Sequence, residues 1–386
     1  MRVVIAPDSF KGTASAVDVA AAVAAGWHDE RPDDDLVLVP MADGGEGTMD
    51  AFAAAVPATE RVPVTVTAPD GRPVETSWLR LPDGRAVVEL AATSGIGLLD
   101  EPRPDTADTT GFGEAVVAAL DAGVTGLLLG IGGSASTDGG VGALRALGLR
   151  LTLGEGDEAG GAHAADASTG GALLDSVTAV DRMTLRPLPP LGVTVLSDVT
   201  SPLLGPEGAA TVFGPQKGVT PDRVAVHEAR LAQWAALFPE VDPTTPGAGA
   251  AGGAGFGLLA WGARLGSGAT AVAEALGLAE TVATAHLVVT GEGRYDGQTA
   301  AGKTPAVVTA LAAAARVPVG LVAGAVEADL DGFAIAASLT VIATQITGEP
   351  DDALRDPLRF ARIAGARLAL RAQSAPICEQ PRSKET

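Results

Sequence analysis

Both ends of this chain alternate apolar runs of strand length with alanine-rich helical stretches, whereas its middle does not. Ser15 and Asp18 form a capping-box signature at the start of the first such helix. The predicted strands of the two ends are VVIAP (3–7), LVLVP (36–40), HLVVT (286–290), VPVGLVAG (317–324) and LTVIATQ (339–345). Strands that alternate with helices in this way are typical of a doubly wound α/β domain with a parallel sheet.

The middle of the chain opens with a different pattern. From Arg61 onward the short alternating runs RVPVTVTAP, PVETSWLRL and GRAVVEL follow one another, joined by Asp-Gly pairs at 70–71 and 83–84. Such turn pairs between alternating runs predict an antiparallel sheet.

These patterns predict how the chain is divided into domains. We expect one doubly wound α/β domain, residues 1–60 plus 285–372, into which a second, mixed α/β domain, residues 61–284, is inserted. Active sites favour clefts between domains, so we expect the active site in the inter-domain cleft. The polar tail 373–386 is expected to be disordered.

The charge balance limits the partners of the chain. Its formal net charge is −21, which argues against nucleic acid and anionic membranes. No apolar stretch is long enough to span a bilayer, and the first apolar run is too short for a signal peptide, so we expect a soluble, cytoplasmic protein. The only cysteine, Cys378, excludes disulfides and thiolate metal clusters. The oligomeric state stays open.

Several loops combine glycines, hydroxyl side chains, carboxylates and lysines. They are PDSFKGT (7–13), PMADGGEGT (40–48), GIGGSASTDGG (130–140), LSDVTSPLLG (196–205), FGPQKG (213–218) and TGEGRYDGQTAAGKT (290–304). Only four of the 26 basic residues are lysines, and three of these, Lys11, Lys217 and Lys303, lie beside glycine in these loops. Backbone amides, lysines and carboxylates that can hold Mg²⁺ are the groups that phosphoryl transfer requires.

One of these loops contains GQTAAGKT (297–304), which fits the P-loop pattern G-x-x-x-x-G-K-[ST]. A P-loop also needs a strand that runs straight into its first glycine and a helix that begins at the lysine. Here GEGRYD separates the strand HLVVT from Gly297, and Pro305 is expected to begin the next helix after the Lys-Thr pair. A true P-loop is therefore the weaker interpretation.

Other classes of site find less support. The loop GIGGSASTDGG lacks the G-x-G-x-x-G spacing of a dinucleotide-binding domain, since position 135 is Ala, which counts against a nicotinamide-dependent dehydrogenase. None of the four histidines has metal-ligand spacing. We expect His28, His163 and His227 on the surface and a structural role for His286.

Taken together in this order, the loops resemble those of the bacterial glycerate kinases of the type 1 family. The resemblance runs from residue 1 to about 372 and rests on IAPDSFKGT, MADGGEGT, ATSGIGLL, GIGGSASTDGG, SDVTSPLLGPEGA, FGPQKG, GAGAAGG and GEGRYDGQTAAGKTP. The chain departs from the family at Ser201, where Asn is frequent, and at residues 135–138, where the family often has Ala-Thr-Asn-Asp. Both departures keep the polar character of the loop.

The resemblance implies a flavodoxin-like domain with a second domain inserted into it, and ATP-dependent phosphorylation of D-glycerate, an organic acid, with Mg²⁺. The product expected is 2-phosphoglycerate, with 3-phosphoglycerate and a nicotinamide-dependent hydroxy-acid dehydrogenase as alternatives. The family's motif also extends beyond the letters of the P-loop, so residues 297–304 are expected to be a convergent Gly-Lys-Thr loop, with Lys303 near phosphate or the substrate carboxylate.

We expect Asp198, Lys11 and Asp8 to be catalytic, and Asp198 and Asp43 to be the metal ligands. Lys217 and Lys303 are expected to bind the substrate carboxylate and phosphates, with Ser134 and the amides of Gly132 and Gly133 beside them. The remaining expected binding residues are Ser9, Gly44, Gly45, Glu46, Asp138, Glu292, Arg294, Asp296, Thr299 and Gly302.

Overall fold

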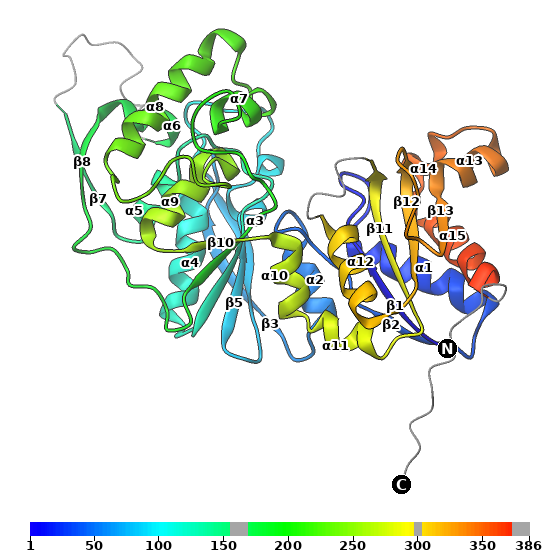
Figure 1. Cartoon of the computed structure of the whole chain (residues 1–386). Coiled ribbons are helices and arrows are strands. Elements are labelled where there is room, and N and C mark those ends of the chain that lie inside the picture. Colours follow the sequence, from blue (N-terminus) through cyan, green and yellow to red (C-terminus); the bar gives the residue numbers. More distant parts are fainter. Residues whose placement is uncertain (155–168, 297–302, 373–386) are drawn as a thin grey trace. The chain divides into compact units, whose positions relative to one another are not determined.

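The computed structural model describes residues 1–154, 169–296 and 303–372 (Figure 1). Contacts within the chain divide it into two compact units. The first unit consists of Met1–Ala42 and Ala273–Thr386, and the second of Asp43–Val272. The domain boundaries expected from the sequence lie 12 to 18 residues further along the chain and stay a prediction.

A five-stranded, wholly parallel sheet forms the centre of the first unit. Its strands, in spatial order, are β13 (Ile335–Ser338), β12 (Val319–Val326), β11 (Leu287–Tyr295), β1 (Arg2–Pro7) and β2 (Asp35–Leu38). Numbered along the chain within this sheet, the order is the flavodoxin-like 2-1-3-4-5 read from the β2 edge. The expected α/β, flavodoxin-like fold is therefore confirmed, and its topological switch point lies between β1 and β11.

Helices cover the sheet of the first unit (Figure 1). They are α1 (Ala16–Glu30), α11 (Leu278–Ala283), α12 (Thr304–Ala315), α13 (Leu339–Thr347), α14 (Asp352–Arg355) and α15 (Pro357–Ala372). Ser15 caps α1, as predicted, by accepting a hydrogen bond from Asp18 N at 3.1 Å. Helices α1 and α15 touch backbone to backbone, because a Cβ atom added to Gly26 would lie 1.8 Å from the Arg362 carbonyl oxygen.

Two expectations for the first unit are wrong. The run LTVIATQ is not a strand but most of helix α13; its buried residues Leu339, Ile342 and Ala343 have the i, i+3, i+4 spacing of a helix face. The strand is the short β13 just before it. Furthermore, β11 does not end at Thr290 but continues to Tyr295, because its last residues pair with β12.

The start of α12 also differs from the expectation. The helix begins at Thr304, with Lys303 as its N-cap, rather than after the Lys-Thr pair. Both local arguments against a P-loop context are therefore wrong: a strand ends just before Gly297, and a helix begins at the Lys-Thr pair. Residues 297–302 themselves lie outside the described residues.

The second unit contains a six-stranded mixed sheet. In spatial order its strands are β10 (Arg264–Gly266), β9 (Val193–Leu196), β6 (Gly126–Gly130), β5 (Arg85–Glu89), β4 (Pro73–Arg80) and β3 (Glu60–Thr67). The runs read as antiparallel sheet are β3, β4 and β5, and they pair as predicted. However, β5 also pairs in parallel with β6, so it joins the antiparallel and parallel halves of the sheet. A separate two-stranded ribbon consists of β7 (Arg150–Leu153) and β8 (Val177–Asp181).

The hydrophobic core of the second unit is larger than that of the first, and helices pack around it. They are α2 (Thr48–Ala55), α3 (Ala91–Ser94), α4 (Thr110–Asp121), α5 (Val141–Ala146), α6 (Gly170–Leu173), α7 (Ala209–Phe213), α8 (Val224–Ala236) and α9 (Ala254–Trp261), with α10 (Gly268–Ala275) following β10. Trp234 and Phe238 of this core pack edge to face, with ring centroids 4.8 Å apart. His227 of α8 is fully buried, so its expected surface position is wrong.

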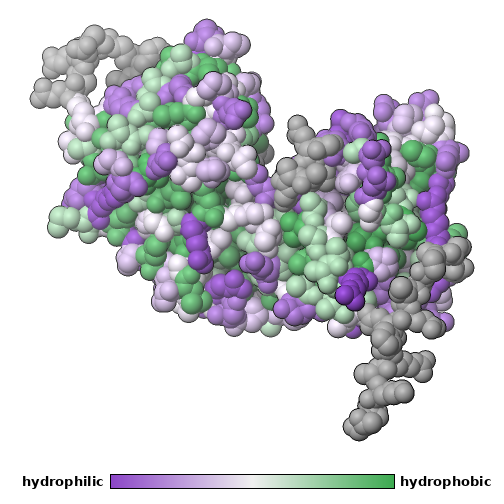
Figure 2. Space-filling view, in the orientation of Figure 1, coloured by the Kyte–Doolittle hydropathy of each residue, from purple (hydrophilic) through white to green (hydrophobic). Residues whose placement is uncertain are grey.

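The described surface carries exposed apolar side chains mainly as single residues. On the face shown in Figure 2, hydrophilic and hydrophobic residues are interspersed over the second unit. Met183 is 92% exposed and Leu191 60% exposed. Of the helices in the described ranges, none has the length and apolar character needed to cross a bilayer.

Candidate active site

Three loops of the second unit meet where β6 and β9 end. Gly44 has φ +89°, and a Cβ atom added to it would lie 2.1 Å from the Leu196 carbonyl oxygen at the end of β9. The Gly132 amide, just after β6, donates a hydrogen bond of 3.0 Å to the Gly44 carbonyl oxygen. Only glycine fits these contacts, so the loops MADGGEGT and GIGGSAS pack backbone to backbone at the carboxyl edge of the sheet.

The loop MADGGEGT carries two acidic side chains in different surroundings. Asp43 is half-buried, and its Oδ1 accepts a hydrogen bond of 3.1 Å from Gly45 N. Glu46 lies at the exposed tip of the loop. The loop thus carries one half-buried and one exposed carboxylate on either side of Gly44 and Gly45, whose backbone lies against Gly132.

The sequence analysis missed a carboxylate that holds the same loop. Glu89 ends β5, is 5% exposed, and accepts hydrogen bonds from Gly47 N (3.1 Å) and Met49 N (3.0 Å). Burial raises the pKa of Glu89, and the two amide hydrogen bonds oppose that rise. Its position at the end of the strand GRAVVEL was the signal that could have identified it.

Asp198, which follows β9, is half-buried and fixed by another segment. Its Oδ1 accepts a hydrogen bond of 2.8 Å from Ser267 Oγ, and its Oδ2 accepts one of 3.4 Å from Ala269 N in the first turn of α10. Burial raises the pKa of Asp198, and the negative charge of Asp43 raises it further, while the Ser267 hydrogen bond opposes the rise. Two of the predicted metal or acid-base carboxylates are therefore close enough to influence each other.

Asp138 lies inside the glycine loop rather than on its surface. It is fully buried and accepts hydrogen bonds from Thr109 N and Oγ1, Ser136 Oγ, Gly140 N and Gly142 N. A carboxylate with this many donors fixes the conformation of the loop around it.

Lys217 is also buried, with 1% of its surface exposed. Its Nζ donates hydrogen bonds to Ser134 Oγ (2.7 Å) and to the Ser136 carbonyl oxygen (2.5 Å). Burial lowers the pKa of Lys217 to about 7, and the charge of Asp138 partly opposes this. Lys217 therefore contacts the glycine loop itself, and its partner Ser134 is 6% exposed.

The first unit places a second group of predicted residues at its switch point. Asp8 follows β1 and is 6% exposed; its Oδ1 accepts a hydrogen bond of 2.7 Å from Ser9 N, and its Oδ2 accepts one of 3.1 Å from Thr304 Oγ1. Pro7 pairs with Gly291, so Asp8 and the buried Glu292 lie next to each other across β1 and β11. Thr304 is the first residue of α12, and the sequence analysis did not single it out.

The other predicted residues of the first unit are more exposed. Lys11 lies on the tight turn between Phe10 and Ala14 and is exposed. Arg294 points to Glu327, with 3.2 Å between Nη1 and Oε1. Asp296 and Lys303 are half-buried on either side of residues 297–302, and the predicted residues Thr299 and Gly302 lie outside the described residues.

The fold and these loops define a class of protein. The flavodoxin-like sheet carries a carboxylate and a helix N-terminus at its switch point. Glycine loops, lysines and strand-end carboxylates lie in the same chain. This combination is typical of an α/β phosphotransferase.

Comparison with known proteins identifies the family. The glycerate kinase family model matches residues 3–369. The chain is 41% identical over 339 residues to the glycerate 2-kinase of Escherichia coli K12, covering 86% of this chain and 87% of the relative. It is 41% identical over 338 residues to the glycerate kinase of Bacillus subtilis 168, covering 85% and 86%. A crystal structure described as glycerate kinase 2 of Salmonella typhimurium LT2 matches with a TM-score of 0.80 and 38% identity over 97% of this chain and 98% of that one. The chain therefore belongs to the glycerate kinase family, as its loops predicted.

Proposed function

We propose that this kinase transfers the γ-phosphoryl group of ATP to the 2-hydroxyl of D-glycerate, giving 2-phosphoglycerate. The observation that carries the choice of the 2-hydroxyl is the 41% identity, over most of both chains, with a relative named glycerate 2-kinase. Transfer to the 3-hydroxyl, giving 3-phosphoglycerate, is the alternative.

Asp198 is the proposed acceptor of the proton from the glycerate hydroxyl. Its pKa is raised by burial and by the Asp43 charge, which makes it a stronger base than an exposed carboxylate. The hydrogen bonds from Ser267 and Ala269 fix its orientation, as a catalytic side chain requires. The Gly132 amide, which was expected to bind the substrate, donates to the Gly44 carbonyl oxygen instead. The amide of Gly133 and the hydroxyl of Ser134 are proposed to bind the substrate beside Asp198.

Lys217 is proposed to act through Ser134. Because its ammonium group is buried against Ser134 Oγ and the Ser136 carbonyl oxygen, it orients the Ser134 hydroxyl and neutralises charge from within the loop. Asp138 is proposed to hold the same loop from the other side through its backbone hydrogen bonds. In this proposal both residues position the substrate-binding groups.

The phosphates of ATP are proposed to bind at the switch point of the first unit. Amides at the N-terminus of α12 and the cations Lys303 and Lys11 supply the positive potential that phosphates require. Ligands of flavodoxin-like sheets bind at the carboxyl ends of the strands beside the switch point, where Asp8 and Thr304 lie.

The carboxylates present fit Mg²⁺ bound in the manner usual for kinases. Among the described residues, no three His, Cys, Asp or Glu side chains are grouped as a metal site. Mg²⁺ at phosphate sites commonly takes only one or two carboxylates and completes its shell with phosphates and water. Asp8 with Thr304 could hold it in this way, and the ion would neutralise charge on the phosphates. Asp43 with Asp198 is the alternative pair, in which Asp198 would be a metal ligand instead of the proton acceptor.

The product decides between the two hydroxyls. The purified chain is supplied with D-glycerate and MgATP, and enolase is added without phosphoglycerate mutase. Immediate formation of phosphoenolpyruvate is expected, because enolase consumes 2-phosphoglycerate directly. If phosphoenolpyruvate forms only after the mutase is added, the product is 3-phosphoglycerate and the proposed site of phosphorylation is wrong.

A further inference from the structure

Thr109 occupies the N-cap position of α4, but its side chain does not cap that helix. It is completely buried, and it makes no side-chain hydrogen bond to the first turn of α4. The Thr110 amide in that turn donates its hydrogen bond, of 2.9 Å, to Asp108 Oδ1 instead. A threonine at an N-cap normally accepts such a bond itself, so the Thr109 hydroxyl is available for other contacts.

The hydroxyl of Thr109 joins the start of α4 to the glycine loop and to α5. Thr109 Oγ1 donates a hydrogen bond of 2.8 Å to Asp138 Oδ2 and accepts one of 2.9 Å from Ala143 N. Thr109 N donates a further bond of 3.0 Å to Asp138 Oδ2. The other donors to this buried carboxylate among the described residues lie within residues 136–142. Thr109 therefore connects the carboxylate at the centre of the glycine loop to a distant segment.

Backbone packing prevents α4 and α5 from shifting apart or closer together without strain. A Cβ atom added to Gly142 would lie 2.6 Å from Thr110 N and 2.9 Å from Thr109 N. One added to Gly113 in α4 would lie 2.6 Å from the Ala143 carbonyl oxygen. Because the two backbones are in direct contact at these glycines, the position of Thr109 determines that of the loop that it holds.

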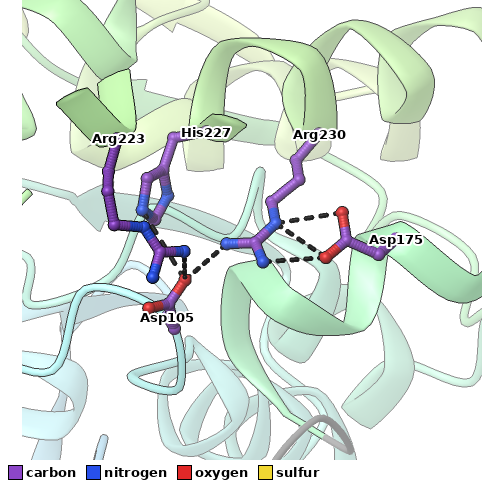
Figure 3. A network of polar contacts seen from close by, with 5 residues as sticks. All are labelled: Asp105, Asp175, Arg223, His227 and Arg230. Atoms are coloured by element: carbon purple, nitrogen blue, oxygen red, sulfur yellow. Dashed lines mark hydrogen bonds and ion pairs between the residues drawn. The ribbon is translucent and has the colours of Figure 1, made fainter. Parts of the chain in front are cut away.

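The segment that leads to Thr109 is anchored at its other end by α8 (Figure 3). Asp105 Oδ1 accepts hydrogen bonds from Arg223 (2.8 Å) and from Arg230 (2.5 Å). Arg230 is 7% exposed and also pairs with Asp175 at 2.7 Å. In Figure 3 these side chains converge on Asp105 from α8 and from the turn that carries Asp175. Charge-assisted hydrogen bonds thus fix the segment on one side, and the contacts of Thr109 fix it on the other.

Ser136 connects Asp138 to the proposed substrate-binding groups of the loop. Its hydroxyl donates a hydrogen bond of 3.0 Å to Asp138 Oδ1, and its carbonyl oxygen accepts one from Lys217 Nζ. Lys217 Nζ also donates to Ser134 Oγ. A shift of Asp138 would therefore displace Ser136, and Lys217 and Ser134 with it.

We propose that Thr109 is a positioning residue of this kinase: through Asp138 it fixes the loop that presents Gly133 and Ser134 to glycerate. This inference rests on the proposed function, in which these two residues bind the substrate. Thr109 itself is buried behind the loop and acts only through Asp138. Its role matters because a displacement on the order of 1 Å of the groups that hold a substrate is enough to lower the rate strongly.

Thr109→Val tests the proposal, because valine keeps the shape of the side chain but can neither donate to Asp138 nor accept from Ala143. We expect kcat/KM for D-glycerate to fall by ~10-fold or more, while the KM for ATP stays unchanged. Thr109→Ser keeps the hydroxyl and should recover most of this loss. Each substrate is varied at a saturating concentration of the other, well below the melting temperature of every variant.

A core variant of the same unit is the matched control. Val124 is buried just before β6, at the end of that strand opposite to the glycine loop. Val124→Ala should lower the melting temperature because it leaves a small cavity, but it should not change the KM for glycerate. The comparison separates a loss of stability from a loss of loop position.

Asp105→Asn provides a second variant if Thr109→Val does not fold. It removes the charge that pairs with Arg223 and Arg230 at a partly exposed site. The KM for glycerate should rise in the same direction, by less than in Thr109→Val, and the KM for ATP should again be unchanged. Wild-type kinetics in whichever of the two variants folds would overturn the inference.

Two further results would also overturn it. One is a loss in Thr109→Val that Thr109→Ser does not recover; the other is a rise in the KM for ATP alone, which would assign the loop to the nucleotide. Ser134→Ala separates the inference from the function on which it rests. If Ser134→Ala loses affinity for glycerate and Thr109→Val does not, only the role of Thr109 is wrong. If Ser134→Ala keeps wild-type kinetics as well, the proposed substrate-binding loop is wrong.

Discussion

Asp198 is the residue whose replacement best separates chemistry from structure. Asp198→Asn keeps the size of the side chain and one acceptor for Ser267, but it removes the charge needed to accept a proton or to hold a metal. We expect a folded protein whose kcat falls by ~10²-fold or more, the usual contribution of a positioned acid or base. Steady-state kinetics at saturating Mg²⁺, with melting temperatures beside them, would measure this.

The matched control is Asp121→Asn, which breaks only an exposed ion pair with Arg186. It should leave kcat unchanged. If Asp198→Asn retained activity within a few fold of the wild type, Asp198 would have only the structural role of fixing Ser267 and the start of α10.

Lys11 is exposed, so its replacement should affect ligands and not the fold. Lys11→Met is expected to lower kcat/KM for glycerate by ~10²-fold, as for other groups that stabilise transition-state charge, with the melting temperature nearly unchanged. Arg355→Met removes an exposed cation of α14 in the same unit and serves as the control. Equal activities of the two variants would assign Lys11 to the surface.

Single residues also show where the sequence is insufficient. The lysines and carboxylates beside glycine were recognised, but whether each is exposed was not predictable from its neighbours in the chain. Lys217 and Asp138 are buried because Ser134, Ser136, Thr109 and two loop amides surround them, and these partners come from separate segments. Glu89 and Thr304 were missed for the same reason, since their partners Gly47 and Asp8 are distant in the sequence.

At the scale of elements, the loop before α2 allows a test of close packing. Gly44 and Gly47 both have positive φ, but only a Cβ atom on Gly44 would clash, at 2.1 Å from Leu196 O; nothing lies within 4 Å of one on Gly47. Gly47→Ala should therefore cost only about 1 kcal/mol of left-handed strain. Gly44→Ala should destabilise the protein by several kilocalories per mole more and abolish activity.

Denaturant unfolding of the two alanine variants would measure the difference. Both alanine variants place a side chain at a positive φ, so the loss of stability in Gly47→Ala measures the backbone strain alone. Subtracting it from the loss in Gly44→Ala leaves the cost of the clash with Leu196. Equal stabilities would mean that the loop can move away from β9 without loss, and the proposed backbone contact between the loops would then not be required.

Helix α8 makes the stability of the fold depend on pH. His227 is fully buried, its two ring nitrogens have no hydrogen-bond partner among the described residues, and burial lowers its pKa from 6.5 to about 4. The unfolded chain therefore takes up this proton near pH 6.5 and the folded chain only near pH 4. Stability is fully present above pH 6.5 and falls by roughly 3 kcal/mol as the pH decreases to 4.

Replacing the ring isolates this contribution. In His227→Phe the pH dependence of the unfolding free energy between pH 6.5 and 4 should be smaller by that amount, as measured by urea unfolding at several pH values. His28→Gln, on the exposed side of α1, is the control and should leave the dependence unchanged. An unchanged slope in His227→Phe would assign the acid sensitivity to carboxylates.

Elements were predicted best where one periodicity dominated. The strands β1 and β12 and the hairpins from β3 to β5 followed from their apolar runs and turns. LTVIATQ was misassigned because its β-branched residues favour a strand locally, while burial of Leu339 and Ile342 against the sheet of the first unit favours a helix. The end of β11 was predicted too early because residues 291–295 are a strand only through their pairing with β12, and this pairing cannot be inferred from the sequence of β11 alone.

For the whole molecule, the sequence predicted the α/β class, because both ends of the chain carry the same alternating pattern of strands and helices. The division into a discontinuous domain and an inserted one stays a prediction from the same pattern. The order of the strands followed only from resemblance to a family, since periodicity does not specify which strands are neighbours. The loops that carry the candidate site residues of both units were predicted from the sequence. The hydrogen bonds that fix Asp198 in the second unit and Asp8 in the first were found only in the structure.

The central position of β1 has a consequence for how the chain is made. Val3, Val4 and Ile5 are almost completely buried, and their partner on one side is β11, beginning at Leu287. On the ribosome, β1 is synthesised long before β11, and it has only β2 beside it until the chain has reached Leu287. Residues 43–272 are complete before β11 is synthesised, so we expect the second unit to fold while residues 1–42 are still unfolded.

Nascent chains stalled at increasing lengths would show this order by limited proteolysis. Protection of the second unit should appear before residue 287 leaves the ribosome, and protection of residues 1–42 only after β11 and β12 have emerged. Early protection of residues 1–42 would contradict it. During this interval an apolar strand with one open edge is exposed, and residues 1–42 are then the part of the chain that most needs a chaperone.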